Sequence, residues 1–90
     1  RADICFLGVG GISKNGISTY ALPETAVNRV ILERTTGHRI IVTEGFKVGR
    51  DSNFHTADCN MITHLITDHT ADPETIAYLK SIGVKVLFIS

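Results

Sequence analysis

Apolar residues in this chain fall into short continuous runs separated by stripes at helical spacing. Four runs are typical of parallel strands buried on both faces, and they cover residues 4–9, 40–42, 65–67 and 84–89. Two stripes predict helices, and they consist of Ala26, Val27, Val30 and Ile31, and of Ile76, Leu79 and Ile82. Strands that alternate with helices indicate an α/β fold with a mostly parallel sheet, right-handed crossovers and flanking helices.

The helix boundaries are marked by capping residues. The first helix is expected to begin at Pro23, a favourable first helical residue, and to end near Gly37 as its C-cap. The second is expected to have Asp72 as its N-cap, Pro73 in its first turn and Gly83 at its end. Residues 8–16 and 44–53 are predicted loops, the first with several positive-φ positions. Residues 53–60 fit no element clearly, and one helical turn is the closest description.

Composition narrows the class of protein. Ninety residues make one domain at most, and 43% hydrophobic with 20% charged residues is ordinary for a soluble globular chain. The net charge is zero, so these residues lack the basic surface of a DNA-binding or membrane-surface domain. No apolar run approaches the ~20 residues of a membrane span. Two cysteines, with Cys5 in an apolar run as a buried hydrophobe, favour a reducing cytoplasm.

The start of the chain suggests missing sequence. Arg1 is not a methionine, and it leads within a few residues into a strand-like run with no cap or helix before it. We therefore expect a fragment of a longer protein. A processed mature protein is the alternative, although no secretory feature supports it.

Candidate binding residues follow the predicted strands, because ligands of open α/β sheets bind outside the strands' carboxyl ends. The first strand ends in a glycine run that includes Gly8, Gly10 and Gly11, whose backbone N–H groups suit an anion. The run is not the dinucleotide fingerprint, because it lies well before the helix instead of opening it. A glycine loop without a ligand is the alternative explanation.

Three charged or polar side chains extend this candidate site. Lys47 follows the second strand and suits a phosphate or carboxylate, unless it is an ordinary surface lysine. Glu24 and Asn28 lie four residues apart and share a face near the helix start, where capping alone would explain Glu24.

Metal, cofactor and catalytic sites are not predicted. The spacing of His55, Cys59, His64 and His69 fits no zinc motif. The chain also shows no arrangement of serine, histidine and acid suited to nucleophilic catalysis.

Five segments together resemble the effector domain of DeoR-family transcription regulators. In chain order they are DICFLGVGGI followed by GIST, then ETAVNR, TEGFKVGR, LITD and LKSIGVKV. Each segment is weak alone, but their order and spacing match the family over essentially the whole chain.

The resemblance implies a fold shared with ribose-5-phosphate isomerase, glucosamine-6-phosphate deaminase and the coenzyme A transferases. It implies a sensor, not an enzyme, that binds a phosphorylated sugar or related metabolite. Binding would modulate how a separate N-terminal winged helix-turn-helix holds operator DNA, in a protein that is usually a homo-oligomer. Residues 1–90 would form the C-terminal part of the effector domain, without its upstream half and without the DNA-binding domain.

The resemblance also assigns site residues. Gly8, Gly10, Gly11 and Gly16 would line the ligand crevice, Glu24 would face the sugar, and Lys47 would meet it from the second strand. Asn28 stands where the family usually has a lysine, which removes one cation from the expected site.

Two other functions remain open. A phosphosugar isomerase or deaminase of the same fold would need a general base near the sugar, and residues 12–16 contain no acid and no histidine. An oligomerisation module without a ligand is the other alternative, and Asn28 is its best support.

Overall fold

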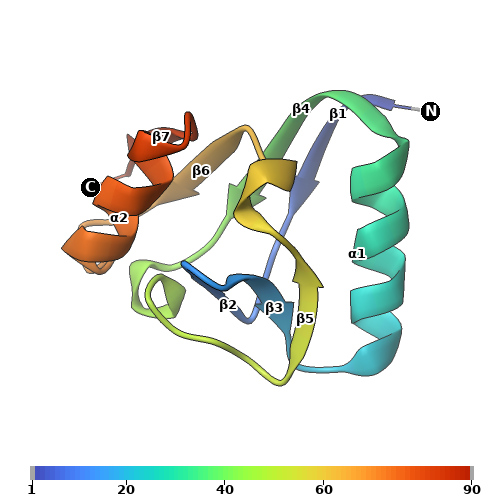
Figure 1. Ribbon diagram of the computed structural model, residues 1–90, viewed down its shortest axis with the longest axis horizontal. Coiled ribbons are helices and arrows are strands. Elements are labelled where there is room, and N and C mark those ends of the chain that lie inside the picture. The colour runs from blue at the N-terminus through green and yellow to red at the C-terminus, as the bar shows by residue number, and fades with distance from the viewer. Residues whose placement is uncertain (1, 90) are drawn as a thin grey trace.

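The computed structural model of the chain describes residues 2–89 and confirms the α/β fold. Four parallel strands form one sheet in the order β1–β4–β6–β7. Their bounds are Ala2–Leu7 for β1, Thr35–Val42 for β4, His64–Thr67 for β6 and Lys85–Phe88 for β7. Because every pairing in this sheet is parallel, all four carboxyl ends lie at the same edge (Figure 1).

A smaller antiparallel sheet lies in front of the parallel one in this view, in the order β2–β3–β5 (Figure 1). Its strands are β2 (Gly11–Ser13), β3 (Gly16–Thr19) and β5 (Phe54–Ala57). The helices are α1 (Leu22–Arg34) and α2 (Pro73–Ser81), and two 3₁₀ turns are η1 (Gly45–Lys47) and η2 (Cys59–Met61). Neither α-helix has the length and apolar content that a membrane crossing would need.

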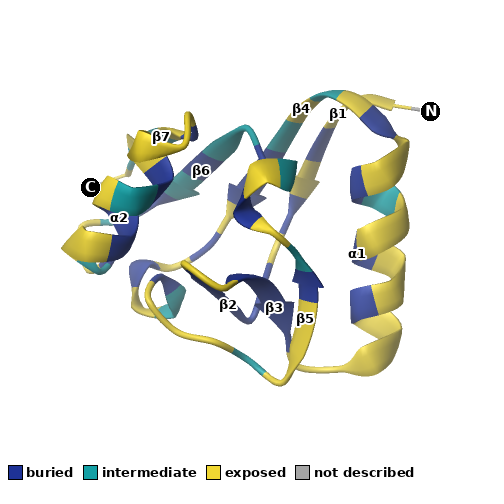
Figure 2. Cartoon of the chain, viewed as in Figure 1, coloured by how far each residue is buried: buried dark blue, intermediate teal, exposed yellow. Residues whose placement is uncertain are grey.

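One face of the parallel sheet forms the core. Register partners across this face are Leu7, Ile41, Leu65 and Val86. Ile41 and Leu65 are fully buried, and Leu32 from α1 and Leu79 from α2 belong to the same cluster. The buried side of α1 faces the sheets while its other side is exposed (Figure 2). One face of each predicted strand segment, including Cys5, is thus confirmed as core.

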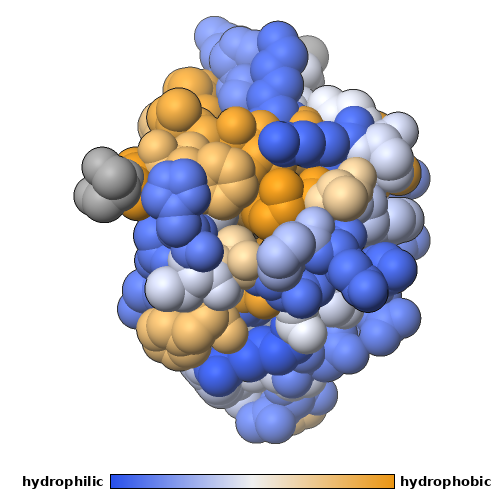
Figure 3. Space-filling model, turned by 90° about the vertical axis from the view of Figure 1, so that its left-hand side faces the viewer, coloured by the Kyte–Doolittle hydropathy of each residue, from blue (hydrophilic) through white to orange (hydrophobic). Residues whose placement is uncertain are grey.

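The opposite face of the parallel sheet is largely open. Its exposed apolar side chains are Ile4, Phe6, Val42 and Leu87, with Phe6 and Leu87 each 60% exposed. In the part of the chain that the structure describes, no helix covers this face. Figure 3 looks onto the end of the molecule formed by α2 and β7, where apolar side chains also gather. The strands were expected to be buried on both faces, and for β1, for β7 and for the end of β4 at Val42 this expectation was wrong.

The predicted loop at residues 8–16 is instead the start of a hairpin. Gly11 pairs with Ser18 and Ile12 with Ile17, across the turn between β2 and β3. Of the glycines in this run only Gly16 has a positive φ, 118°, where several were expected. The physical reason is burial, because Ile12 and Ile17 both enter the core only when the two segments pair.

The buried face of α1 also differs from the prediction. Val27 and Val30 of the expected apolar stripe are more than half exposed, whereas Thr25, Asn28 and Leu32 are buried. The helix packs most closely on β5 and, to a lesser and similar extent, on β1, β3 and β4, and the small sheet presents the buried hydroxyls of Thr19 and Thr56 to it. A polar stripe fits that surface better than an apolar one.

Polar contacts attach α1 to the small sheet. The Thr25 hydroxyl shares a hydrogen bond with that of Thr19, which lies 3.5 Å from the Thr56 hydroxyl. The Arg29 Nε donates to the Thr56 carbonyl at 2.9 Å. Hydrogen bonds to strand backbone and hydroxyls thus replace part of the expected apolar contact.

Gly37 was predicted as a helix C-cap, and this was wrong. The helix ends at Arg34, and β4 begins at once with Thr35, so that Gly37 lies inside a strand. A Cβ at Gly37 would overlap the carbonyl oxygen of Asp3 on β1. The glycine therefore allows close contact where the pairing of β1 with β4 is irregular.

The predicted second helix is confirmed at both ends. The Asp72 carboxylate caps α2 by accepting a hydrogen bond from the Thr75 N–H at 3.0 Å. Gly83 follows the helix with φ of 95°, as a C-terminal glycine should. Leu79 is fully buried, but Ile82 is largely exposed and was wrongly placed in the stripe. Residues 53–60, where one helical turn was expected, contain the strand β5 at Phe54–Ala57, and a helical turn, η2, begins only at Cys59.

The same Leu→Ala substitution should lower the free energy of unfolding by different amounts on the two faces of the parallel sheet. Leu65→Ala should lower the free energy of unfolding by about 2–5 kcal/mol, because it opens a cavity in the core. Leu87→Ala removes the same atoms from the open face of the neighbouring strand and should cost less than about 1 kcal/mol. Urea unfolding followed by circular dichroism measures both. Equal losses would mean that the open face is covered in solution.

Candidate functional site

The carboxyl ends of β1 and β4 place several candidate residues at one edge. The two strands are neighbours, with Leu7 opposite Ile41. Gly8 follows β1, and η1, which contains Lys47, follows β4 by two residues. This edge is the crevice position of an open α/β sheet. Gly10 and Lys47, which are far apart in the chain, both come close to Tyr20, so the structure brings part of the expected set together.

Lys47 is held among aromatic and acidic groups. Its side chain is only 19% exposed, and its Nζ lies 3.5 Å from the Glu44 carboxylate. The same Nζ is 5.7 Å from the centre of the Tyr20 ring and 5.8 Å from that of Phe46. Such distances fit cation–π attraction. The lysine is therefore a partly buried, oriented cation and not a freely solvated one.

Arg50 is a second cation at the same place, which the sequence analysis missed. Its Nε donates to the Gly10 carbonyl at 3.3 Å, and its Nη2 donates to the Tyr20 hydroxyl. Its guanidinium carbon lies 5.4 Å from the Phe46 ring centre. We call Gly10, Tyr20, Phe46, Lys47 and Arg50 the Tyr20 cluster. Arg50 lies in the segment TEGFKVGR, three residues after Lys47, but nothing in that segment distinguishes it from a surface arginine.

Asp68 holds the loop that presents Lys47. Its carboxylate accepts hydrogen bonds at 2.9 Å from the N–H of Gly45, the first residue of η1, and from that of Thr70. The Thr70 hydrogen bonds, followed by that of Gly45, lower the pKa of Asp68 below its ordinary value. The pKa of Glu44 is also lowered, by its own backbone N–H and then by Lys47. Both carboxylates are therefore charged near neutrality.

A depression of about 480 Å³ lies beside this loop, at the carboxyl ends of β4, β6 and β7. Its walls are mainly apolar, with Val42, Ile66 and Ile89 among them, while Glu44 and Asp68 form part of its polar lining. Glu44 is also the ion-pair partner of Lys47, so this one residue connects the lining of the depression with the Tyr20 cluster.

The glycines of the expected site differ in their surroundings. A Cβ at Gly10 would lie 2.8 Å from the Ser52 Oγ, and one at Gly11 would overlap the Arg50 carbonyl oxygen. A Cβ at Gly16 would overlap the Ala57 carbonyl oxygen. These three positions have a packing reason to be glycine. Gly8 is exposed, and nothing lies within 4 Å of where its Cβ would be.

Glu24 and Asn28 lie one turn apart on the same side of α1, as expected, but they differ in burial. Glu24 is exposed in the first turn of α1, and it forms no ion pair within residues 2–89. Asn28 is buried on the side of α1 that packs on the small sheet. The structure therefore separates Asn28 from the exposed surface that Glu24 occupies.

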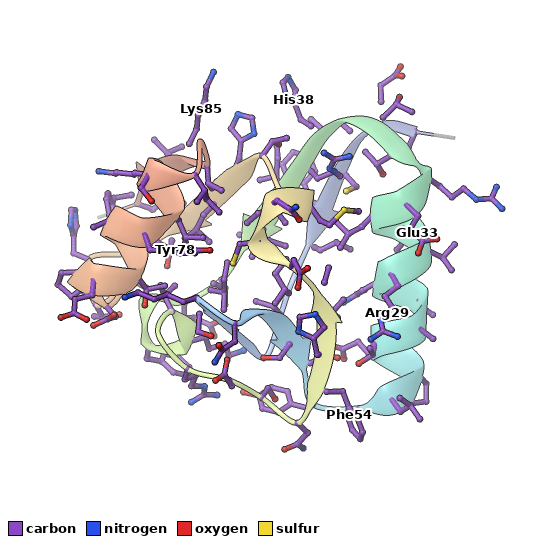
Figure 4. The ribbon with its side chains drawn as sticks, in the orientation of Figure 1. Arg29, Glu33, His38, Phe54, Tyr78 and Lys85 are labelled. Carbon is purple, nitrogen blue, oxygen red and sulfur yellow. The ribbon has the colours of Figure 1, made fainter. Side chains whose placement is uncertain are left out.

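Two histidines and a lysine lie together away from this edge. His38 and Lys85 extend from the other end of the parallel sheet (Figure 4). The His38 and His64 rings meet edge to face with centres 4.9 Å apart, and burial, followed by His38 and Lys85, lowers the pKa of His64. Burial raises the pKa of the Cys59 thiol. Among residues 2–89, no three metal-ligating side chains come together.

The fold and this edge define a class of protein: a small α/β domain with two oriented cations near the carboxyl ends of its parallel strands. The sequence matches the DeoR C terminal sensor domain over residues 1–69. The chain belongs to this family, whose sensor domains are generally non-catalytic. A comparison with curated proteins gave no match. The match ends just before α2, so that β1 to β6 form the part shared with the family.

Replacement by alanine should change the stability of the domain in opposite directions at two glycines of the same run. Gly11→Ala should cost about 1–3 kcal/mol of unfolding free energy, because its Cβ would press on the Arg50 backbone. Gly8→Ala meets empty space at a φ that alanine accepts, so its effect should stay within about 1 kcal/mol and favour stability. Thermal unfolding of both variants measures the contrast. Equal effects would contradict the close packing of the 50–52 segment.

The lowered pKa of Asp68 predicts that the hydrogen bonds of its carboxylate to Gly45 and Thr70 lose their stabilising effect in acid. Since the folded-state pKa lies below the ordinary value of about 3.9, the carboxylate stabilises the fold fully above about pH 4. That stabilisation is lost as the pH falls through the lowered pKa. The stability difference between wild type and Asp68→Asn should therefore be constant from pH 7 to 5 and shrink toward pH 2. A difference that does not change with pH would contradict this role.

Proposed function

We propose that this domain binds a phosphorylated sugar or a related phosphorylated metabolite at the carboxyl edge of β1 and β4. The observation that supports this most directly is the Tyr20 cluster, in which Lys47 and Arg50 are held in fixed orientations. Glu44, the ion-pair partner of Lys47, lines a depression large enough for a small metabolite. Gly8 would approach the ligand after β1, Gly10 would hold Arg50 beside it, and Glu24 would hydrogen-bond a sugar hydroxyl. Gly11 and Gly16 would shape the hairpin behind the site, and Asn28 would support α1 from within.

In this proposal the ligand regulates transcription. Ligand binding would shift a two-state equilibrium of the sensor, and a coupling of about 1–3 kcal/mol would suffice for induction. The operator would be held by a separate N-terminal helix-turn-helix domain, because a net charge of zero gives residues 1–90 no attraction for DNA. Residues 1–90 would be the C-terminal part of the effector domain in a cytoplasmic, homo-oligomeric repressor.

Catalysis is the less favoured function. The structure places one carboxylate near the hairpin tip, because Asp51 accepts a 3.0 Å hydrogen bond from the Asn15 amide and a shorter one from the Ser13 hydroxyl. These two hydrogen bonds lower the pKa of Asp51. A general base works best with a pKa near the working pH, so a carboxylate with a lowered pKa is a poor candidate.

A thermal-shift screen of the full-length protein against phosphorylated sugars and polyols tests the proposal. A ligand at 100 times its dissociation constant should stabilise the protein by about 2.7 kcal/mol. The shift should be reduced in Lys47→Ala and retained in Lys80→Ala, which removes an exposed lysine of α2 outside the Tyr20 cluster.

The outcomes separate the three functions. No shift with any phosphorylated compound would favour an oligomerisation module without a ligand. Turnover of ribose-5-phosphate or glucosamine-6-phosphate would favour the enzyme. Equal losses in both lysine variants would indicate attraction by overall charge and not a site.

A further inference from the structure

The two cations of the Tyr20 cluster differ in what neutralises them. Lys47 forms an ion pair with Glu44 at 3.5 Å. Within residues 2–89 the only other ion pair joins His55 and Asp58, so the Arg50 guanidinium has no carboxylate partner there. Its hydrogen bonds go to two neutral oxygens, the Gly10 carbonyl and the Tyr20 hydroxyl. Arg50 therefore keeps its full charge available for an anion.

The Arg50 guanidinium is also fixed in position. Contacts from β1's loop, from the end of β3 and from η1 hold it, through Gly10, Tyr20 and Phe46 respectively. Two of its five N–H donors are used in these contacts. The remaining N–H groups of the exposed guanidinium are free to donate to a ligand. Because the side chain is already held in one orientation, less rotamer entropy is lost when a ligand binds.

The glycine run provides the space for this arrangement. Side chains at Gly10 and Gly11 would occupy the positions of the Ser52 side chain and the Arg50 carbonyl. The Ser52 N–H donates to the Ser18 hydroxyl of β3 at 2.7 Å, which fixes the same segment from its other side. The Gly10 N–H is already used, because it donates to the Ser18 carbonyl at 2.9 Å. The glycines at positions 10 and 11 therefore allow the segment that contains Arg50 to pack closely. This role explains them better than direct binding of an anion by their N–H groups.

We propose that Arg50 is the principal anion-binding residue of this sensor and that it selects a phosphate monoester by its planar fork. This inference rests on the function proposed above and names the residue that gives the site its specificity. A guanidinium matches a phosphate through two parallel hydrogen bonds, which an ammonium cannot provide. Lys47 adds a second, weaker contact, because Glu44 competes with the ligand for it.

Binding measurements on three variants of the two cations test this assignment. Isothermal titration calorimetry of the full-length protein uses inorganic phosphate and the phosphorylated sugar that gives the largest thermal shift. Arg50→Gln should weaken binding about ten- to hundred-fold, the usual range for losing a charge-assisted hydrogen bond. Arg50→Lys keeps the charge without the fork and should still weaken binding about tenfold. Lys47→Gln should have a smaller effect than Arg50→Gln.

Glu44→Gln gives a prediction of opposite sign. Removing the carboxylate frees Lys47, so phosphate affinity should rise by a few-fold. The matched control is Arg34→Gln, which removes an exposed arginine from the last turn of α1 and should leave affinity unchanged. Circular dichroism establishes that each variant is folded. The Arg50 Nε–H resonance of the wild type should move on titration with phosphate, and this readout requires no substitution.

The possible failures are distinguishable. If Arg50→Gln binds phosphate as the wild type does while Lys47→Gln does not, the role of Arg50 is refuted and the proposed function stands. If Arg34→Gln weakens binding as much as Arg50→Gln, the attraction is non-specific and the assignment fails. If the wild type binds no phosphorylated compound, the proposed function and this inference fail together.

Discussion

Parallel pairing of β1 with β4 is the constraint on which the rest of the structure depends. It places the carboxyl ends of both strands at one edge, and the two segments that leave this edge contain the candidate ligand-binding residues. Gly37 permits this pairing at its irregular end, where any side chain would overlap the Asp3 carbonyl. The chain between the two strands must then cross over, and α1 and the β2–β3 hairpin both lie in that crossover.

The hairpin changes the interpretation of the glycines. In the sequence they resemble a flexible loop whose backbone could cradle an anion, but in the structure Gly11 and Gly16 pair within strands. Their missing side chains are replaced by backbone from residues 50 and 57. A glycine run after a strand thus has two physical explanations, close approach of a ligand or close approach of the protein itself. Here the second accounts for all but Gly8.

Most of the fold could be predicted because its signals are local. Continuous apolar runs located the parallel strands, and the capping residues Asp72 and Gly83 located α2 at both ends. The buried face of α1 could not be predicted from an apolar stripe, because its partner surface contains Thr19 and Thr56 and is known only once β3 and β5 pair.

The candidate site was predicted only in part for the same reason. Lys47 was identified by its position after a strand, which is a property of the sequence. Arg50 could not be identified, because its role depends on contacts with Gly10 and Tyr20, which are distant in the chain. The segment that resembles the family contained both cations, but its pattern gives no indication of which one Glu44 neutralises.

The segment that follows Lys47 connects the site to the rest of the domain. Val48 forms a bridge with Ile12 of β2, and the Gly49 N–H donates to the Ile12 carbonyl at 2.7 Å. The Val48 carbonyl accepts from the N–H of Asp72, the residue that caps α2. A ligand that moved Lys47 or Arg50 would therefore pull on the hairpin and on the start of α2 together. Packed elements move as units and do not deform continuously. A conformational change at the site would therefore be transmitted through residues 47–50 to the hairpin and to α2.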